Sequence, residues 1–444
     1  MIFTPQPHPA VVGYDPGKPL RRVAQVSVHT SPLATLGSKD AGGMNVYIRE
    51  LSCTLGSLGI PVDVFTRRVD RETPEVMTPC DGVNVIAINA GPPKPLDKNE
   101  LFDVLPEFAA NMALYSLRAG VRYDVVHAHY WLSGWAGHLA QRYWDTPLIQ
   151  MFHTTAHMKN AVAGQEHQEI DLRGQIERQL LGMCDSIIAA NPDERADLVW
   201  RMGTPNDKVC TIPPGVNLDV FVPHDRDLAR ARLGLSPDDR VILFCGRVDP
   251  IKGIETLVDA VQRLCADTDA FRPIVLFIGG EVDETGQPAG PLAKVMSQTE
   301  ILGMRDCFRF LGSQPQDQLP VFYSAADLVA VPSRYESFGL VAVEALACGT
   351  PVVASRVGGL KFTIDEGVAG LLAPWGDSQA FADAFSRILG DPEYQRLLAG
   401  NARASVERFS WPSVASSIAQ VYQRLAAGQR GNLCDGAPIF AERA

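Results

Sequence analysis

The stretch "ESFGLVAVEALACGTPVVAS", residues 336–355, decides the fold of the second half of the chain. The apolar run "DLVAVPS" before it predicts a strand, followed by a loop from Arg334 to Phe338. "GLVAVEALAC" predicts a helix with Ser337 as its N-cap and Gly349 as its C-terminal stop. "PVVAS" predicts the next strand. The order strand, loop, helix, strand is typical of a parallel α/β sheet.

The same alternation runs through most of the chain, on both sides of the proline pair at positions 213 and 214. The amphipathic stretch "GMNVYIRELSCTLGSLG" predicts a helix in the first half. Strands are predicted at "RRVAQVSVH", "VDVFTRR", "VNVIAIN", "YDVVHAHY", "PLIQMFH" and "DSIIAAN" in the first half, and at "DRVILFCGR", "PIVLFIGG" and "CFRFLG" in the second. The pattern indicates two doubly wound α/β domains, and their length suits two separate cores.

The predicted boundaries follow this pattern. We expect an N-terminal arm (1–20), a Rossmann-like domain (21–214), a second Rossmann-like domain (215–408), a crossover helix (409–427) and a loose tail (428–444). Ligands of doubly wound sheets bind outside the carboxyl ends of the strands. A cleft where the two sheets face each other is therefore the expected site.

Composition excludes several classes of protein. The formal net charge of −11 argues against a nucleic-acid groove, which needs clustered cations. The first twenty residues resemble neither a signal peptide nor a membrane anchor, and no run of eighteen apolar residues follows. The nine cysteines show no C-x-x-C pair and are interpreted as reduced thiols. We expect a soluble cytoplasmic protein, with weak attachment to a membrane surface left open.

Two acids in the opening stretch suit a sugar ligand. Gly339 permits close approach to free N–H groups at a helix start, where a diphosphate binds well. Glu336 would lie beside the phosphates and Glu344 further along the helix, and each carboxylate can accept two hydroxyl donors. Alone, such a pair is more often a dipole-stabilising acid followed by a solvated glutamate. The preceding strand and the glycine favour the ligand site.

A second signal is "VILFCGRVDPIKGIETLVDAV", which places Arg247 and Lys252 in a strand-to-helix loop. Two cations there can neutralise the charge that develops on a diphosphate leaving group. An isolated arginine and lysine in a loop are usually only solvated. Together with the Glu336 loop in the same domain, they indicate a nucleotide-sugar site.

A third signal lies in the first domain, where the glycines at 42 and 43 in "HTSPLATLGSKDAGGMNVYIRE" open a helix. Their N–H groups could meet an anion or a hydroxyl, although tight turns explain most Gly-Gly pairs. Histidines 127, 129, 153 and 157 lie at or after strand ends. His127 and His129 share a strand face and could bind a metal, but without a third ligand buried, hydrogen-bonded histidines are the favoured interpretation.

The motifs "HTSP", "DAGGMNVYI", "HAHYWLSG", "ESFGLVA" and "RVGGL" together resemble the GT-B glycosyltransferases of family 4, above all the branch that acts on inositol phosphate. The resemblance covers about residues 21 to 425. It implies a retaining hexosyltransferase that uses a nucleotide-diphosphate sugar, expected to be a UDP sugar of the N-acetylglucosamine or glucose class. The implied acceptor is a phosphorylated polyol or sugar. No cofactor and no essential divalent metal are implied, and a homodimer is left open.

Carried over residue by residue, the resemblance also implies roles. It assigns the chemical step to His153, Arg247, Lys252 and Glu336, with His153 near the reacting carbon of the donor sugar. It assigns donor binding to Gly43, Arg247, Lys252, Gln314, Glu336, Ser337, Phe338, Gly339, Leu340 and Glu344. It assigns acceptor binding to His29, Asp40, Asn45, Lys98, Tyr130, Thr154 and Arg173. Two cations and two hydroxyls in the last set would cradle a phosphate.

The sequence departs from the inositol-phosphate branch at two places. Gln314 stands where that branch has an arginine beside the base, and the segment 165–170 differs before Arg173. Sucrose-phosphate synthases have a glutamine where this chain has Met44, which disfavours that alternative without excluding it. Lipid or polysaccharide hexosyltransferases of the same family remain open, as do a UDP-sugar 2-epimerase and a non-catalytic sugar-binding protein. An epimerase would form product without acceptor, whereas a binding protein would form none.

Overall fold

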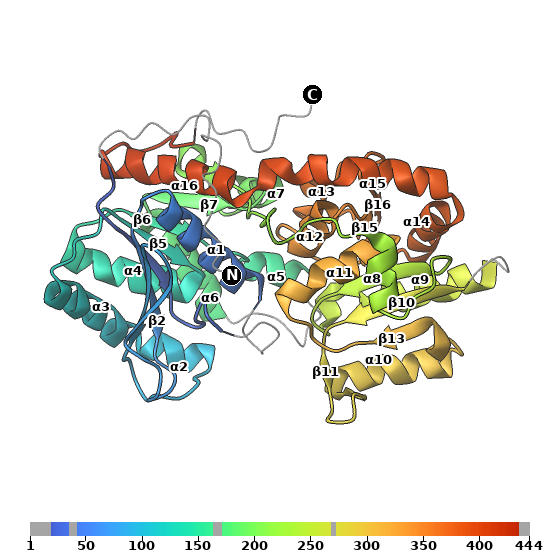
Figure 1. Ribbon diagram of the computed structural model, residues 1–444. Helices are drawn as coiled ribbons and strands as arrows, with labels where there is room; N and C mark the ends of the chain where they lie inside the picture. Colours follow the sequence, from blue (N-terminus) through green and yellow to red (C-terminus); the bar gives the residue numbers. More distant parts are fainter. Residues whose placement is uncertain (1–18, 35–41, 163–170, 268–271, 435–444) are drawn as a thin grey trace.

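A computed structural model describes residues 19–34, 42–162, 171–267 and 272–434, which fold around two parallel sheets (Figure 1). The expected arm up to residue 18 and the tail from residue 435 lie outside the described residues. The α/β architecture predicted from the alternating pattern is confirmed. Two consecutive helices run along the top of Figure 1, α15 (Pro392–Val406) over the second domain and α16 (Trp411–Ala426) over the first.

The first sheet has eight strands in the order β3-β4-β2-β1-β5-β6-β7-β8. All neighbours pair in parallel except β3 and β4. The strands are β1 (Val23–Ser27), β2 (Val62–Arg67), β3 (Val76–Cys80), β4 (Val83–Ile88), β5 (Val125–His129), β6 (Leu148–Met151), β7 (Ser186–Ala189) and β8 (Val209–Thr211). β1 is buried along its whole length, as expected for a central strand covered on both faces.

Helices cover both faces of this sheet. One face carries α2, α3, α4 and α6, whose apolar residues share a core with alternate strand residues. The other face carries α1, for which the predicted helix is confirmed. The helices are α1 (Gly43–Ser57), α2 (Lys98–Asp103), α3 (Leu105–Ala119), α4 (Trp131–Trp144), α5 (Ala156–Val162), α6 (Asp171–Met183) and α7 (Pro192–Ala196). The sequence pattern had not indicated the edge strand β3 or the short β8.

The second sheet has six parallel strands in the order β13-β10-β9-β14-β15-β16. They are β9 (Arg240–Cys245), β10 (Pro273–Ile278), β13 (Phe308–Phe310), β14 (Leu328–Val331), β15 (Val352–Ser355) and β16 (Gly370–Ala373); a small hairpin adds β11 (Glu281–Val282) and β12 (Pro288–Ala289). The helices are α8 (Arg226–Arg232), α9 (Ile254–Asp267), α10 (Gly290–Ile301), α11 (Leu319–Ala325), α12 (Leu340–Ala347), α13 (Leu360–Thr363), α14 (Ser378–Gly390) and α15 (Pro392–Val406).

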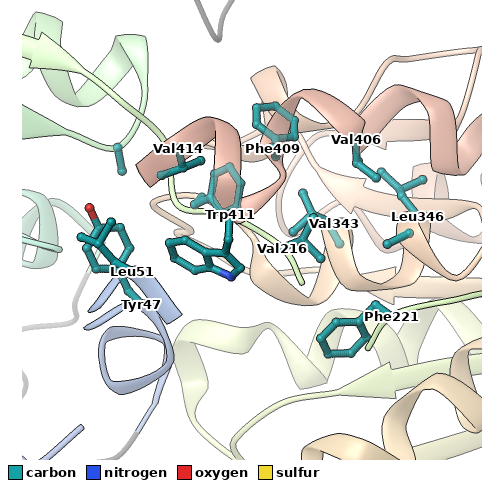
Figure 2. Close-up of a cluster of buried hydrophobic side chains, with 14 of the residues drawn as sticks. Tyr47, Leu51, Val216, Phe221, Val343, Leu346, Val406, Phe409, Trp411 and Val414 are labelled. Carbon is teal, nitrogen blue, oxygen red and sulfur yellow. The ribbon is translucent and has the colours of Figure 1, made fainter. Parts of the chain in front are cut away.

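The helix α16 (Trp411–Ala426) returns from the second domain to the first and packs on α1. Trp411 lies at the junction, with its ring 5.6 Å from the ring of Tyr47 and edge-on to it (Figure 2). A β-carbon on Gly215 would lie 2.6 Å from the Trp411 ring, so the connecting chain needs a glycine there. One apolar core therefore continues from the first domain through α16 into the second.

Two expectations about the ends and the cysteines are wrong within the described residues. Cys53 in α1 and Cys80 in β3 form a disulfide with Cα atoms 5.8 Å apart, so not all nine cysteines are reduced thiols. The start of the expected loose tail is packed: Leu433 is buried and the N–H of Asn432 donates to the carbonyl of Asp207. These contacts hold residues up to Cys434 against the first domain.

Candidate functional site

The loop after β9 presents the two predicted donor cations. Arg247 is about half exposed (52%) and lies 3.9 Å from the carboxylate of Asp249. Lys252 ends the short helix η4 (Pro250–Lys252), whose first N–H groups are capped by Asp249. A β-carbon on Gly253, which has φ +66°, would lie 2.0 Å from the carbonyl oxygen of Pro332. The loop is thus pressed against the carboxyl end of β14.

The Lys252 ammonium and the Glu336 carboxylate form an ion pair of 2.7 Å. The backbone carbonyl of Glu336 accepts a hydrogen bond from the N–H of Gly359, in the "RVGGL" loop. A β-carbon on Gly358 would lie 2.1 Å from that same carbonyl. The two predicted donor motifs and "RVGGL" therefore meet in one place, where a cation and a carboxylate lie side by side.

The helix α12 begins differently from the prediction. Ser337 is not its N-cap; Gly339 is, with φ +96°, and no side chain caps the helix start. The carbonyl of Ser337 instead accepts a hydrogen bond of 2.6 Å from the Asn191 amide of the first domain. Phe338 is buried and packs edge-on against Phe409. An uncapped helix start next to Lys252 suits an anion, and Gly349 follows the helix with φ +77° as predicted.

Glu344 lies on the buried face of α12, where its carboxylate accepts a hydrogen bond of 2.9 Å from the Tyr323 hydroxyl. Burial raises the pKa of Glu344 to about 7, against the effect of this bond and of a hydrogen bond from Gln316; the charge of Glu50 raises it further. Gln316 accepts a bond of 2.8 Å from Arg49, so α1 of the first domain reaches the surroundings of Glu344. The carboxyl group therefore titrates near neutral pH.

The predicted acceptor residues surround one aromatic ring. The Tyr130 ring lies 4.5 Å from the His29 ring, 4.7 Å from the Arg173 guanidinium and 5.5 Å from the Lys98 ammonium. Arg173 also donates to the hydroxyl of Thr154 at 3.3 Å and to its carbonyl at 2.5 Å. Five predicted residues from five separate segments therefore converge at the carboxyl ends of β1, β5 and β6.

Buried charge characterises this cluster. Arg173 and Glu177 form an ion pair of 2.7 Å within one turn of α6, and both side chains are fully buried. Burial, followed by the charge of Lys98, lowers the pKa of His29 to about 3, so this ring is neutral. The hydroxyl of Tyr130 is buried and has no hydrogen-bond partner among the described residues. The cluster offers positive charge and a spare hydroxyl group, which suits an anion.

Two residues of the site have backbone conformations that side chains rarely adopt. Tyr130 (φ +76°) follows β5, and His153 (φ +59°) follows β6. Strained residues at strand ends are typical of binding sites.

The histidines near these strand ends are neutral. His153 lies 3.2 Å from His129, and burial lowers the pKa of His153 to about 3. His127 bonds the Tyr422 hydroxyl at 2.7 Å, which confirms the interpretation as buried, hydrogen-bonded histidines. No group of three metal-ligating side chains occurs within the described segments.

The start of α1 in the first domain lies against the start of α12 in the second domain. The Asn45 amide donates to the hydroxyl of Thr30 at 2.7 Å, and its oxygen accepts from the N–H of Gly42. A β-carbon on Gly43 would lie 3.0 Å from the side chain of Leu340, which opens α12 in the other domain. Asp40 lies outside the described residues. Gly43 and Leu340, both predicted to bind the donor, therefore lie next to each other although they belong to different domains.

Gln314 lies after β13, and its amide donates to the carbonyl of Leu311 at 2.7 Å. Its side chain therefore faces its own loop. Sequence reasoning had not singled out Tyr47, whose ring lies 5.2 Å from the ring of His153, or Glu50, which bonds Asn217 of the second domain at 3.1 Å. The sequence offered one signal for Tyr47 and Glu50, which is their position in the helix that Gly43 opens.

Two family profiles together match most of the chain. The profile described as Glycosyltransferase Family 4 matches residues 41–220, and that described as Glycosyl transferases group 1 matches residues 225–405. The chain belongs to glycosyltransferase family 4. It is 40% identical to a D-inositol 3-phosphate glycosyltransferase of Streptosporangium roseum (93% of this chain, 94% of the relative) and 42% identical to one of Geodermatophilus obscurus (90% and 89%).

Solved structures share the GT-B fold of this family-4 enzyme. A sucrose-phosphate synthase from Thermosynechococcus elongatus is 36% identical and superimposes with a TM-score of 0.82, covering 92% of this chain and all of that one. HepE of Anabaena, in complex with UDP and glucose, is 20% identical with a TM-score of 0.68 and covers 91% and 99%. The described residues contain no helix of the length and apolarity needed to cross a membrane.

Proposed function

We propose that this glycosyltransferase transfers a hexose, of the N-acetylglucosamine or glucose class, from a UDP sugar to a phosphorylated polyol such as inositol phosphate, with retention of configuration. The observation that carries the proposal is the convergence of Lys98, Arg173 and Thr154 around Tyr130, in a protein whose other domain holds the Lys252–Glu336 pair. A phosphate beside two cations and two hydroxyls receives charge-assisted hydrogen bonds. The relatives named as D-inositol 3-phosphate glycosyltransferases support the choice of inositol phosphate as acceptor.

On the donor side, Arg247 and Lys252 would bind the diphosphate and stabilise the charge that grows on it as the glycosidic bond breaks. Glu336, released from Lys252, would accept hydroxyls of the transferred sugar, and Glu344 hydroxyls of the ribose. The neutral ring of His153 would contact the sugar near its reacting carbon. Phe338 and Leu340 would flank the helix start, and Gln314 would lie towards the base.

The chemical step needs no protein base in this proposal. In a retaining transfer the leaving phosphate and the acceptor hydroxyl lie on the same face of the donor, so the phosphate oxygen can take the proton of that hydroxyl. The protein then contributes positioning, electrostatic stabilisation and exclusion of water. The buried histidines fit this division, because their lowered pKa values keep them neutral and leave the positive charge to lysine and arginine.

A second acceptor class is a sugar phosphate, which the 36% identical sucrose-phosphate synthase favours. Both acceptor classes present a phosphate to the Lys98–Arg173 cluster and differ in the ring that carries the attacking hydroxyl. Met44 precedes Asn45 where sucrose-phosphate synthases have a glutamine, and this difference disfavours the sugar-phosphate acceptor.

The test supplies UDP-N-acetylglucosamine, UDP-glucose and GDP-mannose separately with inositol phosphate, unphosphorylated inositol and fructose 6-phosphate, and identifies products by mass. The proposal expects product from a UDP sugar and inositol phosphate, and far less from inositol. Equal use of both inositols would reject the phosphorylated acceptor. Product without any acceptor would indicate the epimerase alternative.

A further inference from the structure

Two cysteines of the second domain lie close together although 42 positions separate them in the sequence. The Sγ atoms of Cys265, near the end of α9, and Cys307, at the end of η5 (Arg305–Cys307), are 4.0 Å apart. A disulfide has sulfurs about 2.05 Å apart, so a displacement of about 2 Å would join them. Cys265 is half-buried at the end of a helix, where such a displacement disturbs little packing.

The charges around this pair favour thiolate chemistry. The hydrogen bond from Cys265 lowers the pKa of Cys307 to about 7, and the Arg272 guanidinium lowers it further, against burial and the charge of Asp306. The same hydrogen bond, together with burial, raises the pKa of Cys265, so Cys307 carries the thiolate of the pair. Arg272 is exposed and lies directly before β10. A cation beside a thiol pair stabilises the thiolate, which is the reactive form. By contrast, Cys184 is buried, and burial raises its pKa to about 12.

We propose that Cys265 and Cys307 form a reversible dithiol–disulfide modification site, oxidised by low-molecular-weight disulfides. The Cys265 thiol, the more accessible of the two, passes its proton along the hydrogen bond to the Cys307 thiolate and attacks one sulfur of such a disulfide, which forms a mixed disulfide. The first expelled thiolate takes up the proton that Cys307 had released. Cys307 then attacks the Sγ of Cys265 and expels the second thiol. The protein loses two electrons and two protons, and the small disulfide is reduced to two thiols. The reaction needs no other oxidant.

The site joins the distal ends of two elements that lead to the donor loops. α9 begins after Gly253, next to Lys252, and β13 follows Cys307 and leads to Gln314. The bond would fix these distal ends, whereas the donor residues lie at the opposite ends. Oxidation is therefore expected to stabilise the second domain. This proposal does not depend on the identity of the donor or acceptor.

The first experiment maps the bond in the full chain. The protein is equilibrated with mixtures of reduced and oxidised glutathione, blocked with iodoacetamide, digested with trypsin without reduction and analysed by mass. The expected product joins peptides 264–294 and 306–309 and disappears on reduction. The bond between Cys53 and Cys80, which joins peptides 50–67 and 72–98, is the internal control. Absence of the first product where the control bond is complete would overturn the proposal.

A second experiment measures stability in a Cys53→Ser, Cys80→Ser background, so that only the second pair contributes. Oxidation should raise the apparent Tm of this protein by about 4 to 8 °C. Cys265→Ser and Cys307→Ser should each abolish both the shift and the cross-linked peptide, whereas Cys184→Ala should retain them. Loss of the shift in only one serine variant, or a cross-link to another cysteine, would reject this pairing.

Discussion

The acceptor cluster of the first domain and the donor loops of the second differ in what their charges contact before a ligand binds. Arg173 is fully buried and held by Glu177, and Tyr130 is held between its cationic neighbours. Arg247 is about half exposed, and Lys252 is paired with the very carboxylate expected to bind the sugar. Under the proposed function, the acceptor half is preorganised by buried contacts, whereas the donor half would exchange an internal ion pair for its ligand.

This difference predicts the largest effect at the acceptor cations. Lys98→Ala should weaken acceptor binding by about 2 to 5 kcal/mol, because it removes one partner of a charge pair that the bound acceptor would bury. The matched control is Lys94→Ala, an exposed lysine in the segment before α2. Acceptor saturation with inositol phosphate and with inositol measures the effect. An unchanged preference for the phosphorylated acceptor would separate Lys98 from the phosphate.

Arg173 needs a different variant, because Arg173→Ala alone would leave the buried Glu177 carboxylate unpaired. We expect Arg173→Ala in a Glu177→Gln background to fold and to lose a similar amount of acceptor affinity. Combined with Lys98→Ala, the total loss should be smaller than the sum, because both cations act on one phosphate. Full additivity in this double-mutant cycle would indicate two independent sites.

The next largest effect is expected at the donor cations. Lys252→Ala and Arg247→Ala should each lower turnover by about a hundredfold or more, since each removes stabilisation that grows in the transition state. Lys252→Ala also frees Glu336, so its unfolding free energy should change by less than about 1 kcal/mol, as for other partly exposed pairs. Lys294→Ala, an exposed lysine of α10, is the control. Unchanged turnover in either variant would remove its diphosphate role.

Part of the fold could be predicted from the sequence alone. The spacing of apolar residues and the positions of turn residues predicted the strands β9 and β14 and the helix α1, because buried strands and amphipathic helices follow regular patterns. The pairing of Cys53 with Cys80 could not be predicted, since it depends on where the edge strand β3 lies beside α1. The N-cap of α12 was assigned to Ser337 because serine is a frequent N-cap, but the positive φ of Gly339 moved the helix start.

Tertiary contacts account for most of what sequence could not supply at the site. Lys98 begins α2, which follows β4, and Arg173 lies in α6, which follows β6, yet both contact Tyr130 after β5. The family resemblance had indicated this set. Tyr323 and Gln316, the neighbours of Glu344, carry no local motif. Their role depends on a buried carboxyl group from another segment, which only the folded chain reveals.

A third prediction separates the two acids of the donor side. Glu344→Gln should weaken UDP binding about tenfold at pH 8, whereas Glu336→Gln should spare UDP and impair transfer from the UDP sugar. Ribose hydroxyls favour the ionised carboxylate, so UDP affinity should fall as the pH drops through about 7, and the Glu344→Gln variant should lose this component. Calorimetry at pH 6 and pH 8 tests both points. Equal loss of UDP affinity in both variants would reject the division.

The raised pKa of Glu344 also makes the unfolding free energy of the protein depend on pH. The pKa of this carboxyl group in the folded state, about 7, lies above its ordinary value of 4.5, so between these values the folded state binds more protons than the unfolded state. The unfolding free energy should therefore fall as the pH rises through this window, and Glu344→Gln should reduce that dependence. Urea unfolding at pH 5 and pH 8 measures it. An identical pH dependence in both proteins would contradict the raised pKa.

The smallest expected effect concerns the Tyr130 hydroxyl, which is buried without a hydrogen-bond partner among the described residues. Tyr130→Phe keeps the ring, and with it the contacts to Lys98, Arg173 and His29. If the hydroxyl serves the acceptor phosphate, the variant should lose about 1 kcal/mol of acceptor affinity, a factor of about five. Donor affinity should be unchanged.

Stability distinguishes a binding role from a structural one. A hydroxyl that makes no bond in the free protein contributes nothing to folding and costs desolvation, so Tyr130→Phe should have an unchanged or slightly higher Tm. A lower Tm with unchanged acceptor affinity would mean that the hydroxyl supports the fold instead. We expect weaker acceptor binding at equal or greater stability. That combination would mean that the Tyr130 hydroxyl contributes to binding of the acceptor and not to folding.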